Sequence, residues 1–107
     1  MENINLLKLN ESSYKYYCKN VNVNSLSTLT DARLKMTRNM HLSIIYKTNK
    51  KKTWYAYGNL RFMVKDDVVE WIENGHLQHP KWEKDMNKYR ELSKKLGIKT
   101  TQKIGGD

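Results

Sequence analysis

The segment TWYAYGNLRFMVK, residues 53–65, constrains the fold more than any other part of this chain. Its central Gly58-Asn59 pair lies between two runs rich in aromatic and apolar residues. Glycine at the first central position of a two-residue loop is typical of a type II′ hairpin. A turn of this length fixes which residues of the two strands lie opposite each other. The expected pairs are Tyr57 with Leu60, Tyr55 with Phe62 and Thr53 with Val64.

A further strand precedes this hairpin, so the sequence predicts a three-stranded antiparallel meander at about 42–48, 53–57 and 60–65. A four-residue loop at 49–52 places Tyr46 opposite Tyr55 and Ile44 opposite Tyr57. Two turn lengths chosen independently then produce one uncharged face, which we expect to pack in the core. Its members are Leu42, Ile44, Tyr46, Tyr55, Tyr57, Leu60, Phe62 and Val64.

Three helices are expected around the meander, at 27–39, 67–74 and 80–96. The first shows apolar residues at helical spacing. Asp67 and Glu70 form a D-x-x-E variant of the capping box, which predicts the start of the second helix. Pro80 suits the first turn of the third helix, and Gly97 suits a Schellman-type end.

Residues 10–24 fit two structures. A short helix at about 12–20 is predicted by the i, i+3, i+4, i+7 spacing of Tyr14, Tyr17, Cys18 and Val21. A strand is predicted instead by the alternation of Tyr16 with its neighbours, and both interpretations stay open. Taken together, the patterns predict an α+β fold, with one globular domain at 1–98 and a disordered basic tail at 99–107.

The net charge is +9, from 20 Lys and Arg against 11 Asp and Glu, which favours association with polyanions. Only four of these cations are arginines, so contact with phosphates should outweigh the reading of base edges. The single cysteine, Cys18, excludes an internal disulfide and is typical of a reducing compartment. No secretory signal and no apolar run of about 20 residues is present, so we expect a cytoplasmic protein without a membrane span. The abundance of Lys, Asn, Tyr and Ile also fits small phage accessory proteins, for which the compartment is the host cytoplasm.

No pattern of catalytic or metal-binding residues appears in the sequence. His76 and His79 stand three apart, and His41 begins a strand, but no Cys-x-x-Cys or His-Glu-x-x-His spacing accompanies them. Asp67 and Glu70 already serve as helix caps in this interpretation, so they do not indicate a magnesium-dependent nuclease. We therefore expect no enzyme activity, no cofactor and no bound metal.

The opposite face of the meander mixes apolar and cationic residues and is the candidate binding surface. Trp54 lies there across from Lys47 and diagonal to Arg61, within reach of a cation–π contact. A tryptophan among cations can stack on a base while its neighbours hold phosphates. Alternatively, a helix covers this face and Trp54 belongs to the core. The predicted interface consists of Lys47, Lys50, Lys51, Lys52, Trp54, Arg61 and Lys65, with a secondary basic patch of Arg33, Lys35 and Arg38.

These features favour a small, basic, non-enzymatic protein that binds nucleic acid, RNA ahead of DNA, mainly through its phosphate backbone. A second hypothesis is a phage-type accessory protein that docks its basic surface on an acidic host protein and inhibits or modulates it. Exposed aromatic residues and arginines suit both kinds of interface. The sequence leaves the two hypotheses open.

Overall fold

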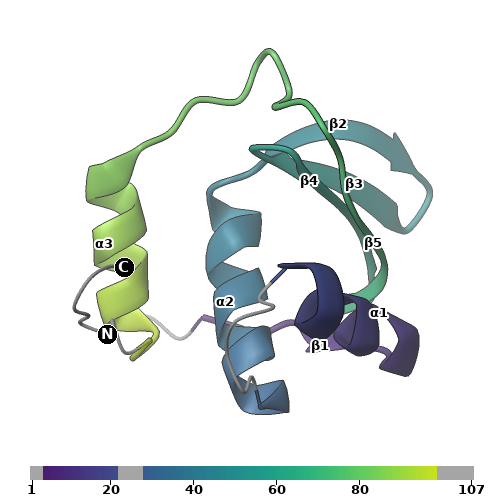
Figure 1. The fold of residues 1–107 in the computed structure, drawn as a ribbon, viewed down its shortest axis with the longest axis horizontal. Coiled ribbons are helices and arrows are strands. Elements are labelled where there is room, and N and C mark those ends of the chain that lie inside the picture. Colours follow the sequence, from purple (N-terminus) through teal and green to yellow (C-terminus); the bar gives the residue numbers. More distant parts are fainter. Residues whose placement is uncertain (1–3, 22–27, 99–107) are drawn as a thin grey trace.

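The computed structural model describes residues 4–21 and 28–98 and shows an α+β fold (Figure 1). The expected tail at 99–107 lies outside the described residues. The strands are β1 (Lys8–Leu9), β2 (Ile44–Asn49), β3 (Lys52–Tyr57), β4 (Leu60–Lys65) and β5 (Val68–Asn74). The helices are α1 (Glu11–Tyr16), which continues as a π-helical segment (Tyr17–Val21), α2 (Leu29–His41) and α3 (Met86–Lys95).

The strands form one mixed sheet in the order β1-β5-β4-β3-β2, in which β1 pairs with β5 in parallel and the other neighbours are antiparallel. The β3–β4 register is confirmed, with Tyr57 opposite Leu60, and its two other expected pairs are also present. A type II′ turn requires a positive φ at its first central residue only. Gly58 has a φ of 60°, and Asn59 has no positive φ, so the turn fits this type.

The helix expected at 67–74 is wrong, because this segment is strand β5. Asp66 and Asp67 have φ values of 51° and 64°, and Lys65 pairs with Val68 across them. Positive φ at both central residues is the conformation of a type I′ hairpin turn, which Asp tolerates better than most residues. The two carboxylates thus belong to a turn and do not cap a helix, and the meander gains a fourth strand.

The pairing of β2 with β3 differs from the expected register at a β-bulge. Lys47 lies opposite Trp54 as expected, but Ile45 and not Tyr46 lies opposite Tyr55. Ile44, expected opposite Tyr57, lies opposite Ala56. Tyr46 is the extra residue, and a bulge of one residue shifts every position beyond it by one. The loop is also shorter than four residues, since β2 extends to Asn49, which pairs with the first residue of β3.

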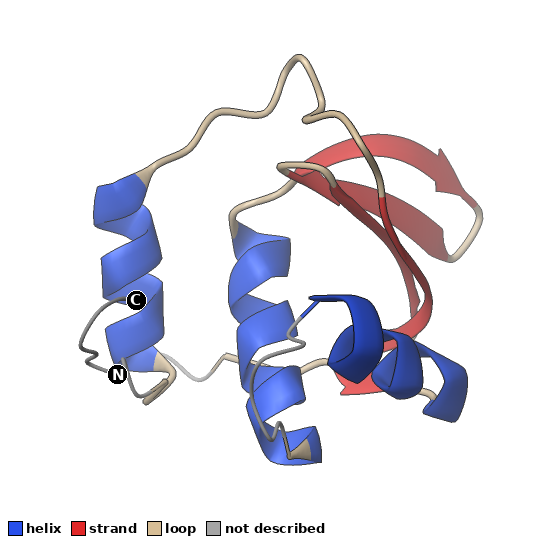
Figure 2. Ribbon diagram, in the orientation of Figure 1, coloured by secondary structure: helices blue, strands red, loops and turns tan. Residues whose placement is uncertain are grey.

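Helices α1 and α2 cover one face of the sheet, which we call the inner face, and α2 lies between the sheet and α3 (Figure 2). The helical interpretation of residues 12–20 is therefore correct. Phe62 and Met36 are completely buried where the sheet meets α2. Of the expected apolar face, Leu60, Phe62 and Val64 belong to this core, and Tyr55 and Tyr57 pack against it partly buried. The buried cluster comprises Leu7, Tyr17, Ala32, Met36, Leu60, Phe62, Val64, Val69 and Ile72.

The last helix begins at Met86 and not near Pro80, with Asp85 as its N-cap. The preceding segment is held in a non-helical course by two hydrogen bonds. The His79 amide donates to the Gly58 carbonyl at 3.0 Å, and the Trp82 indole N–H donates to the Leu42 carbonyl at 2.9 Å. The Schellman-type end is confirmed, since the amides of residues 97 and 98 donate to the carbonyls of residues 94 and 93.

Candidate nucleic-acid interface

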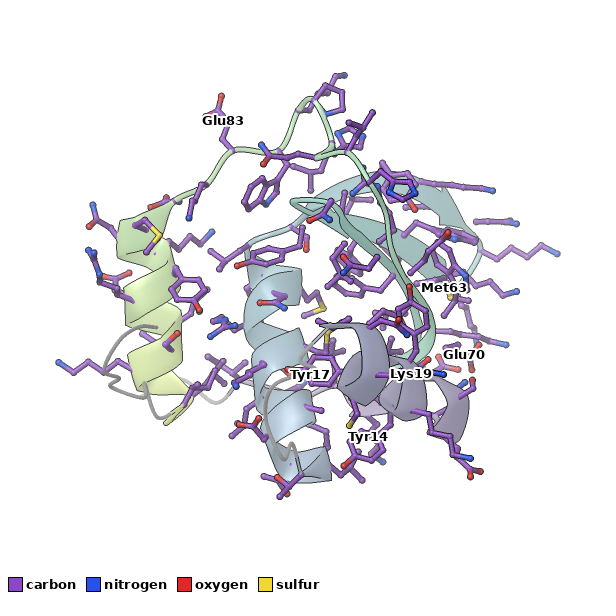
Figure 3. The ribbon with its side chains drawn as sticks, viewed as in Figure 1. Tyr14, Tyr17, Lys19, Met63, Glu70 and Glu83 are labelled. Carbon is purple, nitrogen blue, oxygen red and sulfur yellow. The ribbon has the colours of Figure 1, made fainter. Side chains whose placement is uncertain are left out.

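The sheet face turned away from α1 and α2, which we call the outer face, carries no helix in the described part of the chain (Figure 2). Four residues lie side by side across its strands, one from each of β2 to β5. Met63 is on the side of the sheet away from α2 in Figure 3. We call this line the tryptophan row: Lys47, Trp54, Met63 and Trp71.

Met63 lies between the two tryptophans of the row. Met63 is 8% exposed, whereas Trp71 is 38% exposed and Trp54 is half-buried. The Nζ atom of Lys47 lies 4.6 Å from the centroid of the Trp54 ring. Trp54 is thus neither covered by a helix nor fully open: it lies on the outer face with a cation above its ring.

Arg61 lies in the next row of the outer face but does not reach Trp54. Its guanidinium donates to the carbonyls of Gly58 at 2.8 Å and Leu77 at 3.2 Å, which anchors the loop after β5 to the β3–β4 turn. The expected cation–π contact between Arg61 and Trp54 is therefore absent, and this arginine is committed to backbone carbonyls.

Tyr46, expected in the core, is 38% exposed, and its ring packs against His79 with centroids 5.8 Å apart. The pKa of Tyr46 is raised, mainly by partial burial. The positive charge of Arg61 opposes this increase, and the negative charge of Glu73 adds to it. These two charged residues lie opposite each other on β4 and β5, on the outer face. The bulge has moved Tyr46 from the core to the surface, where it extends the aromatic area.

A shallow hollow of about 350 Å³ lies at the β2–β3 turn, beside one end of the tryptophan row. The described ion pairs, Lys15–Glu11 and Lys35–Asp31, involve none of its cations. The neighbouring β4–β5 turn, with its two aspartates, offsets part of this positive charge. We call it the lysine hollow, and its lining residues are Asn49, Lys50, Lys51, Lys52 and Lys65.

The secondary basic patch does not form one exposed surface. Arg33 donates from Nε to a backbone carbonyl 2.9 Å away. Arg38 is only 8% exposed, with its guanidinium carbon 4.2 Å from the centroid of the Tyr89 ring. Lys35 pairs with Asp31 at 3.3 Å. Two of these three cations therefore contribute to folding contacts, and the patch is not part of the candidate interface.

The described residues contain no group of three or more His, Cys, Asp or Glu side chains placed to hold a metal ion. His41 and His76 are exposed, and the His79 ring packs against Tyr46.

A hydrogen bond with Cys18 is the main cause that raises the pKa of Tyr14. None of the described helices is long and apolar enough to span a bilayer.

Trp71 and Tyr46 were not expected as surface aromatics: Trp71 was placed in a helix and Tyr46 in the core. The signal for Trp71 was available: two aspartates followed by Val68 and Val69 suit a tight turn and a β-branched strand. The signal for Tyr46 was not, since alternation along a strand does not reveal a bulge.

The candidate interface lies within the part of the chain that a protein-family model matches. A model of the YorE family matches residues 7–95, which include every strand and helix described above. The chain belongs to the YorE family. It is 34% identical over 105 residues to the SPbeta prophage-derived uncharacterized protein YorE of Bacillus subtilis (strain 168), covering 88% of this chain and 84% of that protein. No solved structure matches the chain.

Proposed function

We propose that this YorE-family protein is a non-enzymatic binder of single-stranded nucleic acid, RNA ahead of DNA. The observation that carries the proposal is the tryptophan row beside the lysine hollow, on a sheet face that no described helix covers. Bases can stack on exposed aromatic rings of a sheet while lysines hold the adjacent phosphates. Trp71, at 38% exposure, is the more accessible platform.

The ligand is a single strand because stacking on Trp54 and Trp71 requires bases that are not paired within a duplex. The free cations of this surface are lysines, which contact phosphates as point charges. Arg61 is already bound to backbone carbonyls and is not free for bidentate contact with guanine. The tryptophan row and the lysine hollow therefore support binding with little dependence on sequence.

The proposal is tested by fluorescence anisotropy with labelled single-stranded RNA, single-stranded DNA and duplex of equal length, at several salt concentrations. Single strands should bind more tightly than duplex, and log Kd should rise linearly with log salt. Binding that stays constant from low to high salt, or that favours duplex, contradicts the proposal.

A second candidate function is modulation of an acidic host protein, which the prophage origin of the Bacillus subtilis relative favours. Leu77 supports it too, since it is 79% exposed although its carbonyl is anchored by Arg61. An exposed apolar side chain on a fixed loop suits a protein interface. Capture of one host protein that persists after nuclease treatment of the lysate supports this candidate; loss of every captured partner supports nucleic-acid binding.

A further inference from the structure

A second cavity lies apart from the tryptophan row, where the β3–β4 turn meets α2 and the segment before α3. Its volume is about 390 Å³, within the range of about 300–1,000 Å³ that is usual for small-molecule sites. We call it the amide pocket, because four of its described lining residues carry carboxamide side chains: Asn39, Asn59, Asn74 and Gln78.

The aromatic wall of the amide pocket is fixed in place. Tyr57 and Trp82 meet edge to face, with ring centroids 5.2 Å apart. The Trp82 ring lies over Gly58, where an added Cβ would stand 3.7 Å from it. Because the indole N–H donates to Leu42, the ring cannot turn without losing that hydrogen bond. Trp82 is only 8% exposed, so its ring is a buried part of the lining, and the half-buried Tyr57 ring is the aromatic surface that stays accessible.

The amides are partly oriented by the fold and keep free polar atoms. Asn59 donates from Nδ2 to the Gly75 carbonyl at 2.8 Å, which leaves its Oδ1 as an acceptor. Asn74 donates from Nδ2 to a carbonyl at 3.1 Å and likewise keeps Oδ1. Asn39 accepts on Oδ1 from Arg38 and keeps its Nδ2 donors. The Gln78 amide makes no hydrogen bond among the described residues, so both of its polar ends are available.

We propose that the amide pocket binds one unstacked nucleobase of a nucleotide. A base edge presents donors and acceptors side by side, and Asn and Gln amides match this pattern. The half-buried Tyr57 ring gives the base an apolar surface to pack on. Among the described residues that line the pocket, Lys84 alone is charged, and it supplies a cation for the phosphate.

This inference deepens the proposed function and rests on it for the source of the base. The two sites share the β3–β4 turn: Gly58 lines the pocket, and its carbonyl accepts from Arg61 of the outer face at 2.8 Å. In this proposal, a strand held on the tryptophan row passes the β3–β4 turn and places one base in the pocket. The row gives affinity without selection, and the pocket selects the base.

The test uses the three indole N–H signals of the ¹⁵N-labelled protein, one each from Trp54, Trp71 and Trp82. AMP, GMP, CMP and UMP are titrated separately. The Trp82 signal should shift while the two signals of the row stay in place. The four Kd values should spread about tenfold, the size expected for one well-placed pair of hydrogen bonds.

Two variants locate the binding. Gln78→Ala should weaken the preferred nucleotide about fivefold, since it removes hydrogen bonds to the base without disturbing any contact of the fold. Asn87→Ala on α3 also removes an exposed amide, outside the pocket, and should leave the Kd unchanged.

The outcomes separate this inference from the proposed function. If oligonucleotides shift Trp54 and Trp71 but no mononucleotide shifts Trp82, the pocket inference is overturned and the proposed function stands. If mononucleotides shift Trp82 but oligonucleotides do not bind to the row, the proposed function fails and the pocket remains a nucleotide site. An equal loss of affinity in both amide variants also overturns the pocket.

Discussion

The ammonium group of Lys47 lies 4.6 Å from the centroid of the Trp54 ring, so a cation and an aromatic platform occupy the same place on the sheet. Trp71 lies beyond Met63, on the other side of the row, and no described cation–π contact involves it. The two tryptophans should therefore differ as stacking residues, because one ring face of Trp54 is already engaged by the lysine.

Trp71→Ala should weaken single-stranded RNA binding by about 1–3 kcal/mol, because one base loses its stacking partner. Trp54→Ala should weaken it by a similar or smaller amount. Trp71→Phe retains an aromatic face and should recover most of the affinity. Anisotropy measures binding, and thermal unfolding measures stability. If the alanine variants lose stability while affinity is unchanged, the tryptophans are structural and the interface is wrong.

Lys52→Ala and Lys65→Ala should each make binding less dependent on salt. Each lysine that contacts a phosphate releases about one counterion, so the log–log slope should fall by about one for each substitution. The two lysines lie opposite each other beside the tryptophan row. Lys88→Ala on α3 removes an exposed lysine elsewhere and is the matched control. A slope that falls equally in the control would show that overall charge, and not the lysine hollow, determines binding.

Asp67→Gly should raise the free energy of unfolding by about 0.5–1 kcal/mol. Asp67 has a φ of 64°, where glycine avoids the steric cost of a Cβ atom. Its carbonyl, which accepts from Lys8, is part of the backbone and is kept. Urea denaturation measures the change.

Gly58→Ala should lower the free energy of unfolding, because Gly58 in the β3–β4 turn has a φ of 60°. An added Cβ meets the Trp82 ring at ordinary contact distance, so the expected loss of about 1 kcal/mol comes from the backbone. If Asp67→Gly destabilises the protein as much as Gly58→Ala does, the type I′ turn before β5 is incorrect.

The β3–β4 hairpin could be predicted from sequence because a two-residue turn containing glycine fixes the register by itself. The nature of β5 could not be read from its periodicity, for a specific reason. Glu70 is an extra residue between the pairs Val64–Val69 and Met63–Trp71, so Val69 and Ile72 both face the core three positions apart. A spacing of three is what a helix produces, and here a bulge produces it.

The candidate site was predictable in part, because the two-residue turn of the β3–β4 hairpin also fixes the places of its residues. The lysines of the turn and Trp54 follow from the hairpin, and the structure places them together with Trp71. Arg61 was assigned to the correct face, but its partners are carbonyls of a loop that is distant in sequence. Single-sequence patterns hold no information about such long-range contacts.

Deprotonation of two core-facing tyrosines should destabilise the protein at high pH. The pKa of Tyr57 is raised, mainly by burial. Arg38 opposes this increase, and Tyr89 adds to it. Burial also raises the pKa of Tyr55, and Asp67 adds to the increase. In the unfolded chain both groups titrate near pH 10. Their contribution is therefore complete below pH 10 and is lost as the pH rises through the folded-state values.

Tyr57→Phe tests this contribution because it removes the ionisable hydroxyl, and no described hydrogen bond involves that group. Urea denaturation from pH 8 to pH 11, with tyrosinate absorbance followed in parallel, should show a shallower loss of stability in the variant than in the parent above pH 10. Tyr16→Phe is a poorer control, because the Tyr16 hydroxyl accepts from the Asn74 amide. Tyr46→Phe is the matched control: Tyr46 is more exposed, so its removal should flatten the pH dependence less than Tyr57→Phe does. An identical pH dependence in the parent and Tyr57→Phe would show that Tyr57 ionises in the folded protein as it does in the unfolded chain.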